Sequence, residues 1–165
     1  MDIRFDALEP RTRYKLMTGT IVPRPIAWVN TLNPDGGCNT APFSFFNGVS
    51  DEPPTLMFCV GKRPDGSGDK DTLVNIRRHG EFVVHLCDED TIEALSFTAG
   101  DFPPGVEELT EYGGLTLVPS ATISVPRIAE APVAYECRLL RLVDLEGTYT
   151  MVIGRIESLY VRDDL

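Results

Sequence analysis

The segment from 23 to 47 constrains the fold of this chain more strongly than any other part of the sequence. Two apolar stretches, PRPIAWVN at 23–30 and NTAPFSFFN at 39–47, flank the turn sequence NPDGG at 33–37. Proline presets the backbone angle φ in such a turn, and glycine accepts the positive φ that a tight hairpin requires. The segment therefore predicts two consecutive strands that pair as a β-hairpin.

The first stretch alternates in the way that a strand with two different faces requires. We expect Ile26, Trp28 and Thr31 to share one face of this strand. Ala27 and Val29 then lie on the opposite face. Trp28, the only tryptophan, is expected in the core rather than against a ligand.

Small polar residues interrupt the second stretch. Asn39, Thr40 and Ser44 stand among apolar neighbours, so their polar groups need hydrogen-bond partners if they are buried. A flat heteroaromatic ligand with polar atoms at its rim would supply these partners, and so would neighbouring backbone. The sequence leaves both alternatives open.

The remaining segments predict a mainly β protein with a few helices. Strands are expected at 23–32, 38–50, 55–61, 81–86, 120–125, 134–144 and 149–161, and helices at 10–17, 70–79 and 91–97 with one helical turn at 106–112. Pro42 cannot donate to a ladder, which indicates a sheet edge or a bulge. Short turns between successive strands favour an antiparallel sheet that closes into a barrel. Because no linker or internal repeat is found, residues 1–165 are expected to form one domain.

Charge and composition narrow the class of partner. The chain has 165 residues, a formal net charge of −10 and a sequence pI of about 4.6. Nucleic-acid backbones and anionic membrane surfaces favour excess Lys and Arg, so neither is an expected partner. No apolar run approaches the roughly 20 residues that cross a bilayer. The first residues, MDIRFD, do not resemble a signal peptide, and four widely spaced cysteines indicate free thiols in a reducing cytosol.

Several catalytic mechanisms are not supported by the motifs. His79 and His85 lie on different predicted elements without metal-ligand spacing, so no metal site is expected, and His85 is expected to be a hydrogen-bonded core residue. No Gly-x-Ser-x-Gly elbow occurs. The glycine spacing at 61–66 resembles a phosphate-binding P-loop but lacks the lysine after its second glycine. No side chain is assigned a catalytic role.

The start of the predicted helix at 70 has two interpretations. Small residues, Lys70 and the hydroxyl of Thr72 surround a helix N-terminus, where unpaired N–H groups and the helix dipole favour an anion such as phosphate. Alternatively, Asp69 or Asp71 caps the helix and Lys70 is solvated. Caps are far commoner than phosphate sites, so the local sequence alone favours the cap.

Arg24 also has two interpretations. It lies between Pro23 and Pro25 at the start of a strand, so its backbone direction is fixed. It could present a cation to a phosphate or a ring carbonyl. It could equally pair with one of the 25 acidic residues at the surface. The sequence does not decide between them.

Four motifs in a fixed order carry a family resemblance. They are PRPIAWV at 23–29, NTAPFSFFN at 39–47, KDTLVNI at 70–76 and EFVVHL at 81–86, supported by VIGRI at 152–156. Together they resemble the flavin reductase-like family of FMN-binding split-barrel proteins, over about residues 14 to 161. The resemblance implies a six-stranded antiparallel Greek-key barrel and a homodimer with one FMN per subunit near the interface.

The resemblance also implies a cofactor site. Three groups of residues would contact FMN: Arg24, Pro25 and Ile26 near the ring, Ala41, Pro42, Phe43 and Ser44 along the isoalloxazine, and Lys70, Asp71 and Thr72 at the phosphate. The implied activity is reduction of FMN by NAD(P)H, with electrons passed to a small-molecule acceptor or a partner monooxygenase in the cytoplasm. The alternatives are an FMN electron carrier and a non-enzymatic binding module.

Two positions depart from the family pattern. His85 stands where many relatives carry Asn, and Tyr149 and Thr150 stand where many carry a histidine. Because that histidine often lies near the flavin or the nicotinamide, the choice between NADH and NADPH and the terminal acceptor are left unassigned.

Overall fold

The computed structural model describes residues 2–63, 65–100, 102 and 114–165. Its main sheet contains β1 (Ala27–Leu32), β2 (Cys38–Phe43), β3 (Phe46–Asp51), β4 (Pro54–Gly61), β5 (Glu81–Leu86), β8 (Val133–Asp144) and β9 (Tyr149–Val161). The other elements are η1 (Phe5–Ala7), α1 (Pro10–Thr20), α2 (Asp71–His79), α3 (Ile92–Phe97), and the short paired strands β6 (Leu117–Val118) and β7 (Arg127–Ile128). The helical turn predicted at 106–112 lies outside the described residues.

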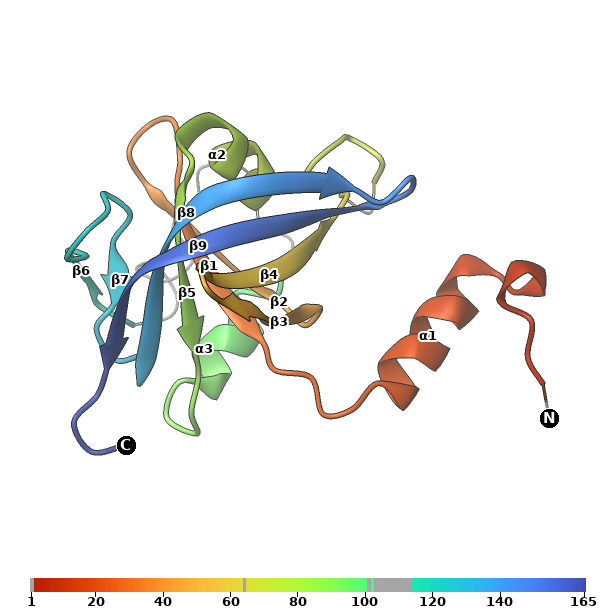
Figure 1. Cartoon of the computed structure of the whole chain (residues 1–165), viewed down its shortest axis with the longest axis horizontal. Helices are drawn as coiled ribbons and strands as arrows, with labels where there is room; N and C mark the ends of the chain where they lie inside the picture. The colour runs from red at the N-terminus through yellow and green to blue at the C-terminus, as the bar shows by residue number, and fades with distance from the viewer. Residues whose placement is uncertain (1, 64, 101, 103–113) are drawn as a thin grey trace.

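The main sheet is antiparallel and curls around a core (Figure 1). Its order is β2-β1-β5-β8-β9-β4-β3, which confirms a mainly antiparallel β architecture. Phe43 lies on one edge strand, and Phe58 lies on β4, beside the other edge. Their ring centroids are only 5.3 Å apart. The two sides of the sheet therefore meet across the interior, as a barrel requires.

The segment at 38–50, predicted as one strand, forms two. The chain bends at Ser44 and Phe45, which separates β2 from β3. Among the described residues the main sheet therefore has seven strands, whereas the family resemblance implies a six-stranded barrel. β2 is an edge strand, as Pro42 predicts, and Pro42 lies opposite Trp28 in the pairing.

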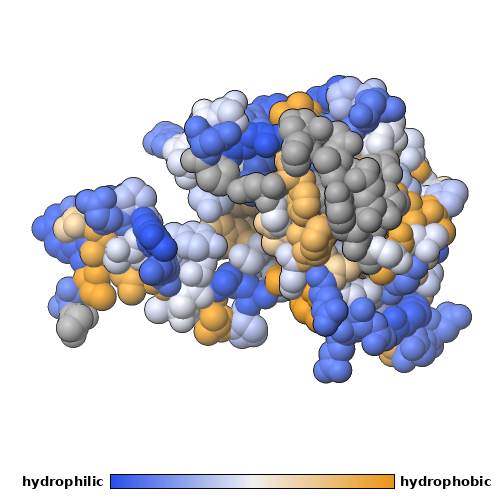
Figure 2. Space-filling model, turned by 180° about the vertical axis from the view of Figure 1, so that it is seen from behind, coloured by the Kyte–Doolittle hydropathy of each residue, from blue (hydrophilic) through white to orange (hydrophobic). Residues whose placement is uncertain are grey.

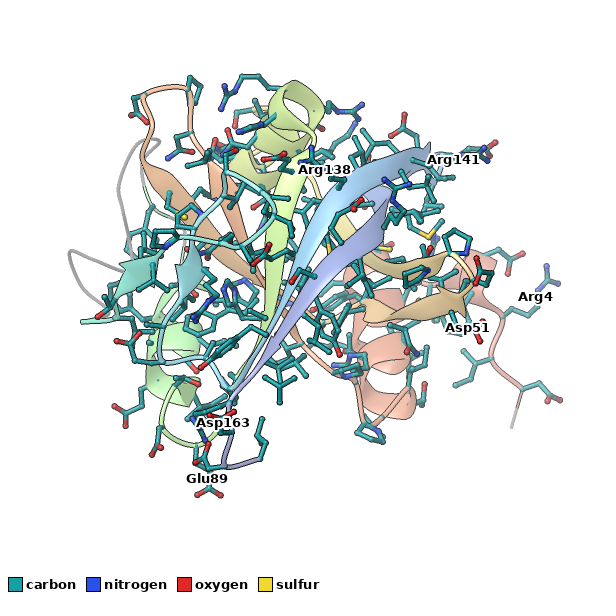
Figure 3. All side chains as sticks on the ribbon, turned by 60° about the vertical axis from the view of Figure 1, so that its left-hand side comes forward. Arg4, Asp51, Glu89, Arg138, Arg141 and Asp163 are labelled. Carbon is teal, nitrogen blue, oxygen red and sulfur yellow. The ribbon has the colours of Figure 1, made fainter. Side chains whose placement is uncertain are left out.

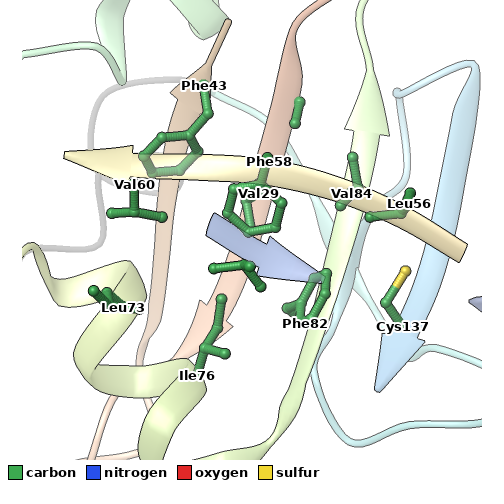
Figure 4. Packing of buried hydrophobic residues seen from close by; sticks show 12 residues of the cluster. Val29, Phe43, Leu56, Phe58, Val60, Leu73, Ile76, Phe82, Val84 and Cys137 are labelled. Atoms are coloured by element: carbon green, nitrogen blue, oxygen red, sulfur yellow. The ribbon is translucent and has the colours of Figure 1, made fainter. Parts of the chain in front are cut away.

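The inner face of the sheet holds the main core (Figure 4). Its buried members are Ala27, Val29, Phe43, Leu56, Phe58, Val60, Leu73, Ile76, Phe82, Val84, Cys137 and Val152. Leu73 and Ile76 come from α2, so this helix packs its apolar face on the core. The helix ends at Gly80, whose φ of 77° is the left-handed conformation that favours glycine after a helix.

The two faces of β1 separate as predicted, with one exception. Ala27 and Val29 point into the main core, whereas Trp28 packs with Leu95 of α3 in a second cluster. Thr31 was expected on the face of Trp28, and that prediction is wrong. Its Oγ1 accepts a hydrogen bond from Asn75 Nδ2 of α2 at 3.1 Å, because odd-numbered residues of this strand share the inner face.

The strand predicted at 120–125 does not form. The main-chain N–H groups of Ala121 and Thr122 donate instead to the two carboxylate oxygens of Glu136, each at 2.7 Å. Buried Ile123 and Val125 produce the alternation that suggested a strand. Side-chain carboxylates therefore take the place of a neighbouring strand as hydrogen-bond acceptors.

A second carboxylate holds the same loop. The N–H and hydroxyl of Ser124 donate to Glu81 Oε2 at 2.8 and 2.6 Å. Arg138 on β8, labelled in Figure 3, lies 2.6 Å from the other oxygen of Glu81. These contacts lower the pKa of Glu81 although burial opposes them.

Helix α1 projects from the barrel (Figure 1) and has no buried residue. Figure 2 shows apolar side chains exposed on this projecting part. All four cysteines are free thiols, as expected. Among the described helices, none combines the length and apolar character needed to span a membrane.

Candidate functional site

Three adjoining hollows run along one side of the barrel. The polar hollow, about 100 Å³, lies between β2, the start of α2, residues 98–100 and Phe102. The middle hollow, about 290 Å³, lies beside the bend between β2 and β3. The outer hollow, about 770 Å³, lies between α1 and the barrel.

The three hollows adjoin one another, because they share lining residues. Pro42 and Lys70 line both the polar and the middle hollow. Tyr14, Ser44, Phe45, Cys59 and Tyr149 line both the middle and the outer hollow. The start of α2 and the proline-flanked arginine are therefore connected along one surface.

The start of α2 is not capped as the local sequence favours. Lys70 occupies the N-cap position and forms no side-chain capping hydrogen bond. Asp69 lies 3.6 Å from Arg77, and Asp71 lies 2.6 Å from Arg63. The cap prediction is wrong because both aspartates pair with arginines. The first N–H groups of the helix keep their capacity to bind an anion.

Thr72 is positioned by a buried polar network. Asn39 Nδ2 donates to Thr72 Oγ1 at 3.0 Å, and Thr72 is only 1% exposed. Since the threonine oxygen accepts this bond, its own proton stays available for a ligand. Asn75 donates to Thr31 and to Asn33 Oδ1, which fixes α2 on the sheet. Neighbouring side chains thus partly satisfy the polar residues of the second stretch.

Lys70 is a cation available at this helix start. In the described part of the chain it forms no ion pair with a carboxylate. The Arg63–Asp71 pair compensates the one carboxylate of the first turn. This donor set of a lysine, a hydroxyl and helix N–H groups fits a phosphate.

The middle hollow is lined by aromatic rings together with polar groups, among them Lys62 and Lys70. Pro42, Phe43 and Ser44 form one side, and Tyr149 forms another. The Tyr149 ring lies over Gly61, where an added Cβ would be 3.2 Å from Tyr149 Cε1. Burial raises the pKa of the Tyr149 phenol, so its proton is retained at neutral pH.

Arg24 and Pro25 line the outer hollow. Arg24 Nη1 donates to the main-chain oxygens of Thr18 and Ile21, at the end of α1. Of the two alternatives for Arg24, the surface ion pair with an acid is not formed in the described part of the chain. Arg24 Nε is buried and has no hydrogen-bond partner there.

The other predicted site residues divide between the hollows and the core. Ala41, Pro42, Lys70, Asp71 and Thr72 line the polar hollow. Ile26 lines none of the three hollows and packs with the cluster around Trp28. Its predicted contact with a cofactor stays a prediction.

Sequence reasoning missed several lining residues, among them Tyr14, Cys59, Arg63 and residues 98–100. None belongs to a motif with a characteristic spacing. Residues 98–100 reach the polar hollow because Trp28 Nε1 donates to Thr98 Oγ1 at 2.9 Å. Only the folded chain reveals such a contact, which joins residues 70 positions apart.

Comparison with known proteins decides the family. The family model described as "Flavin reductase like domain" matches residues 18–165. This chain belongs to that family. The resemblance seen in the sequence is thereby confirmed.

Solved structures of similar proteins support this family assignment and this fold. Nitrilotriacetate monooxygenase component B from Bacillus cereus is 36% identical with a TM-score of 0.95, over 100% of this chain and 83% of that chain. The 2-nitrobenzoate 2-nitroreductase NbaA of Pseudomonas fluorescens is 39% identical with a TM-score of 0.90, and the match covers 100% of this chain and 78% of that chain. A putative flavin reductase with a split barrel domain from Shewanella frigidimarina, at 22% identity and a TM-score of 0.84 over 99% and 81%, shows the same fold.

Proposed function

We propose that this flavin reductase-like protein binds FMN and passes a hydride from NAD(P)H to it, with the electrons going on to an acceptor. The observation that carries this proposal is that the polar, middle and outer hollows adjoin in that order. A cationic helix start lies at one end, and a hollow lined by aromatic rings, Pro42 and polar groups adjoins it. FMN has the same order of parts, with a phosphate tail joined to a flat ring system.

Each end of the cofactor has suitable residues. Lys70, the Thr72 hydroxyl and the first N–H groups of α2 would hold the phosphate. Pro42, Phe43 and Ser44 would line the ring in the middle hollow. FMN, when bound, supplies the two-electron chemistry that side chains lack.

The chain itself positions and shields the reacting rings. Phe45 and Tyr149, with ring centroids 5.6 Å apart, border the middle hollow and would shield a ring bound there from water. The outer hollow adjoins the middle hollow and would give room for a second flat ring beside the first. Hydride transfer needs no acid or base from the protein, so a site without a catalytic triad is adequate.

We also propose that the protein is a cytoplasmic homodimer that serves a partner monooxygenase or a small-molecule acceptor. Ile3, Phe5 and Val22 are 47%, 44% and 65% exposed, and Val49 on the edge strand β3 is 56% exposed. A second copy would cover such apolar side chains. The similarity to a monooxygenase component supports the partner class. The preference between NADH and NADPH is not assigned.

Anaerobic spectroscopy tests the proposed function. The purified protein is reconstituted with FMN, its visible absorbance is recorded, and NADH or NADPH is added. Rapid bleaching of the flavin bands is expected. Bound flavin that stays oxidised would favour an electron carrier, and failure to bind FMN would favour a non-enzymatic module.

A further inference from the structure

His85 is a buried imidazole that the proposed function does not use. It is 0% exposed, and the described lining of the three hollows does not include it. Its Nδ1 lies 2.9 Å from the main-chain oxygen of Trp28 on β1, and the N–H of Ile128 on β7 donates to its Nε2 at 2.9 Å. The imidazole thus holds β7, which pairs with β6 in a separate two-stranded sheet, against the main sheet.

The two residues that His85 holds belong to one apolar cluster. Trp28 and Ile128 pack there with Ala131 and with Leu95 of α3. The rings of Trp28 and His85 also meet edge to face, with centroids 6.2 Å apart. Because Leu95 comes from α3, this helix packs on the cluster. A displacement of Trp28 would therefore move α3 as well.

The indole of Trp28 extends this link to the polar hollow. Its Nε1 donates to Thr98 Oγ1 at 2.9 Å, and the same hydroxyl donates to the main-chain oxygen of Leu95 at 2.9 Å. Thr98 is 3% exposed, so its hydroxyl serves the fold rather than a ligand. Residues 98–100 line the polar hollow together with the start of α2. The position of Thr98 therefore sets how closely this wall approaches the start of α2.

We infer that His85 is a positioning residue for the polar hollow, because through Trp28 and Thr98 it fixes the wall against which a phosphate group would lie. The consequence for FMN rests on the proposed function, whereas the link from His85 to Thr98 does not. A displaced wall would leave Lys70 in place but let water compete for the phosphate. Affinity for a flavin with a phosphate should then fall, while a ring in the middle hollow should bind as before.

A matched pair of variants tests this inference. His85→Asn places an amide nitrogen as many bonds from Cα as Nδ1, so it keeps a donor for the oxygen of Trp28. His85→Gln places its amide as far from Cα as Nε2, so it keeps an acceptor for the N–H of Ile128 instead. Both side chains are uncharged, and each leaves one buried main-chain group unpaired, so their costs in stability should be similar.

The readouts are flavin fluorescence titrations and the emission of Trp28, the only tryptophan. FMN affinity should fall about fivefold in His85→Gln and less than about twofold in His85→Asn, whereas riboflavin affinity should be unchanged in both. Trp28 emission of the ligand-free protein should shift in His85→Gln alone. Equal effects of the two variants would overturn the inference, because a merely structural histidine would not distinguish them.

Thr98→Val tests the other end of the link without changing His85. It removes the acceptor of Trp28 Nε1, so the ratio of FMN affinity to riboflavin affinity should fall about fivefold, and His85→Gln should add little in this background. Val152→Ala, in the main core, is the control for lost stability and should leave the ratio unchanged. An unchanged ratio in Thr98→Val would overturn the inference even if His85→Gln does not fold.

The outcomes separate this inference from the proposed function. If the protein binds neither flavin, the proposed function fails and the emission of Trp28 decides the inference. A shift confined to His85→Gln then upholds the link from His85 to Trp28, and equal shifts or none overturn it. If the protein binds FMN but His85→Gln weakens FMN and riboflavin equally, the function stands and the inference fails.

Discussion

His85 Nδ1 lies 2.9 Å from the main-chain oxygen of Trp28, its antiparallel partner on β1. On the other side of the imidazole, the N–H of Ile128 donates to Nε2 at 2.9 Å. Nε2 must therefore be unprotonated, and Nδ1 carries the proton that it donates to Trp28. The ring links three segments of the fold in its neutral form, and burial lowers its pKa to about 4.

This histidine makes stability depend on pH. The unfolded chain takes up a proton at its ordinary pKa of about 6.5, whereas the folded chain does so only near pH 4. The contribution of neutral His85 to the unfolding free energy is therefore complete above pH 6.5 and falls by about 3 kcal/mol as the pH drops to 4. His85→Asn should reduce the change in the unfolding free energy between pH 6.5 and 5, as measured by urea denaturation. An unchanged slope would contradict this assignment.

The Phe82 ring leaves no room for a side chain at Gly154 on β9. A Cβ added at Gly154 would lie 2.3 Å from Phe82 Cζ, inside the main core. Gly154→Ala should therefore cost about 1–3 kcal/mol of unfolding free energy, measured by urea denaturation. Gly48→Ala is the control, because nothing lies within 4 Å of an added Cβ there, and it should change stability by less than about 0.5 kcal/mol. Similar losses in both variants would contradict the packing argument.

Strong local signals explain which parts of the fold the sequence predicted. β9 has the predicted bounds, and α2 and β8 differ from theirs by one residue, because each combines a clear period with flanking turn residues. The strand predicted at 120–125 does not form. Alternating apolar residues indicate only which side chains are buried, and a loop held by the Glu136 carboxylate can produce the same alternation of buried residues as a strand. Local patterns do not show where a carboxylate from a distant strand will bind.

The candidate site was only partly predictable for the same reason. Lys70 and Thr72 were found from a helix start, which is a local feature. Arg63 was missed because its function depends on its contact with Asp71, eight residues away across an irregular loop. Ile26 was assigned to the site through its motif; it packs against the cluster around Trp28, and its contact with a cofactor stays a prediction.

Thr98 supports one wall of the polar hollow through Trp28. Its Oγ1 accepts from Trp28 Nε1, and both residues are buried. Thr98→Val would leave the indole N–H without its acceptor, so we expect a loss of about 1–3 kcal/mol and a shift in tryptophan fluorescence. Thr98→Ser keeps the hydroxyl and should retain the native spectrum. If Thr98→Val keeps it too, the hydrogen bond is not formed in solution.

The phosphate assignment is tested by comparing FMN with riboflavin, which lacks the phosphate. Lys70→Ala combined with Thr72→Ala removes a cation and a hydroxyl from the start of α2, so FMN affinity should fall at least about tenfold. Riboflavin affinity, measured by the same fluorescence titration, should stay nearly constant because its ring lies in the middle hollow. Lys15→Ala on the exposed helix α1 is the charge-matched control and should affect neither ligand. An equal loss for both flavins would place the phosphate elsewhere, since only contacts with the phosphate distinguish the two ligands.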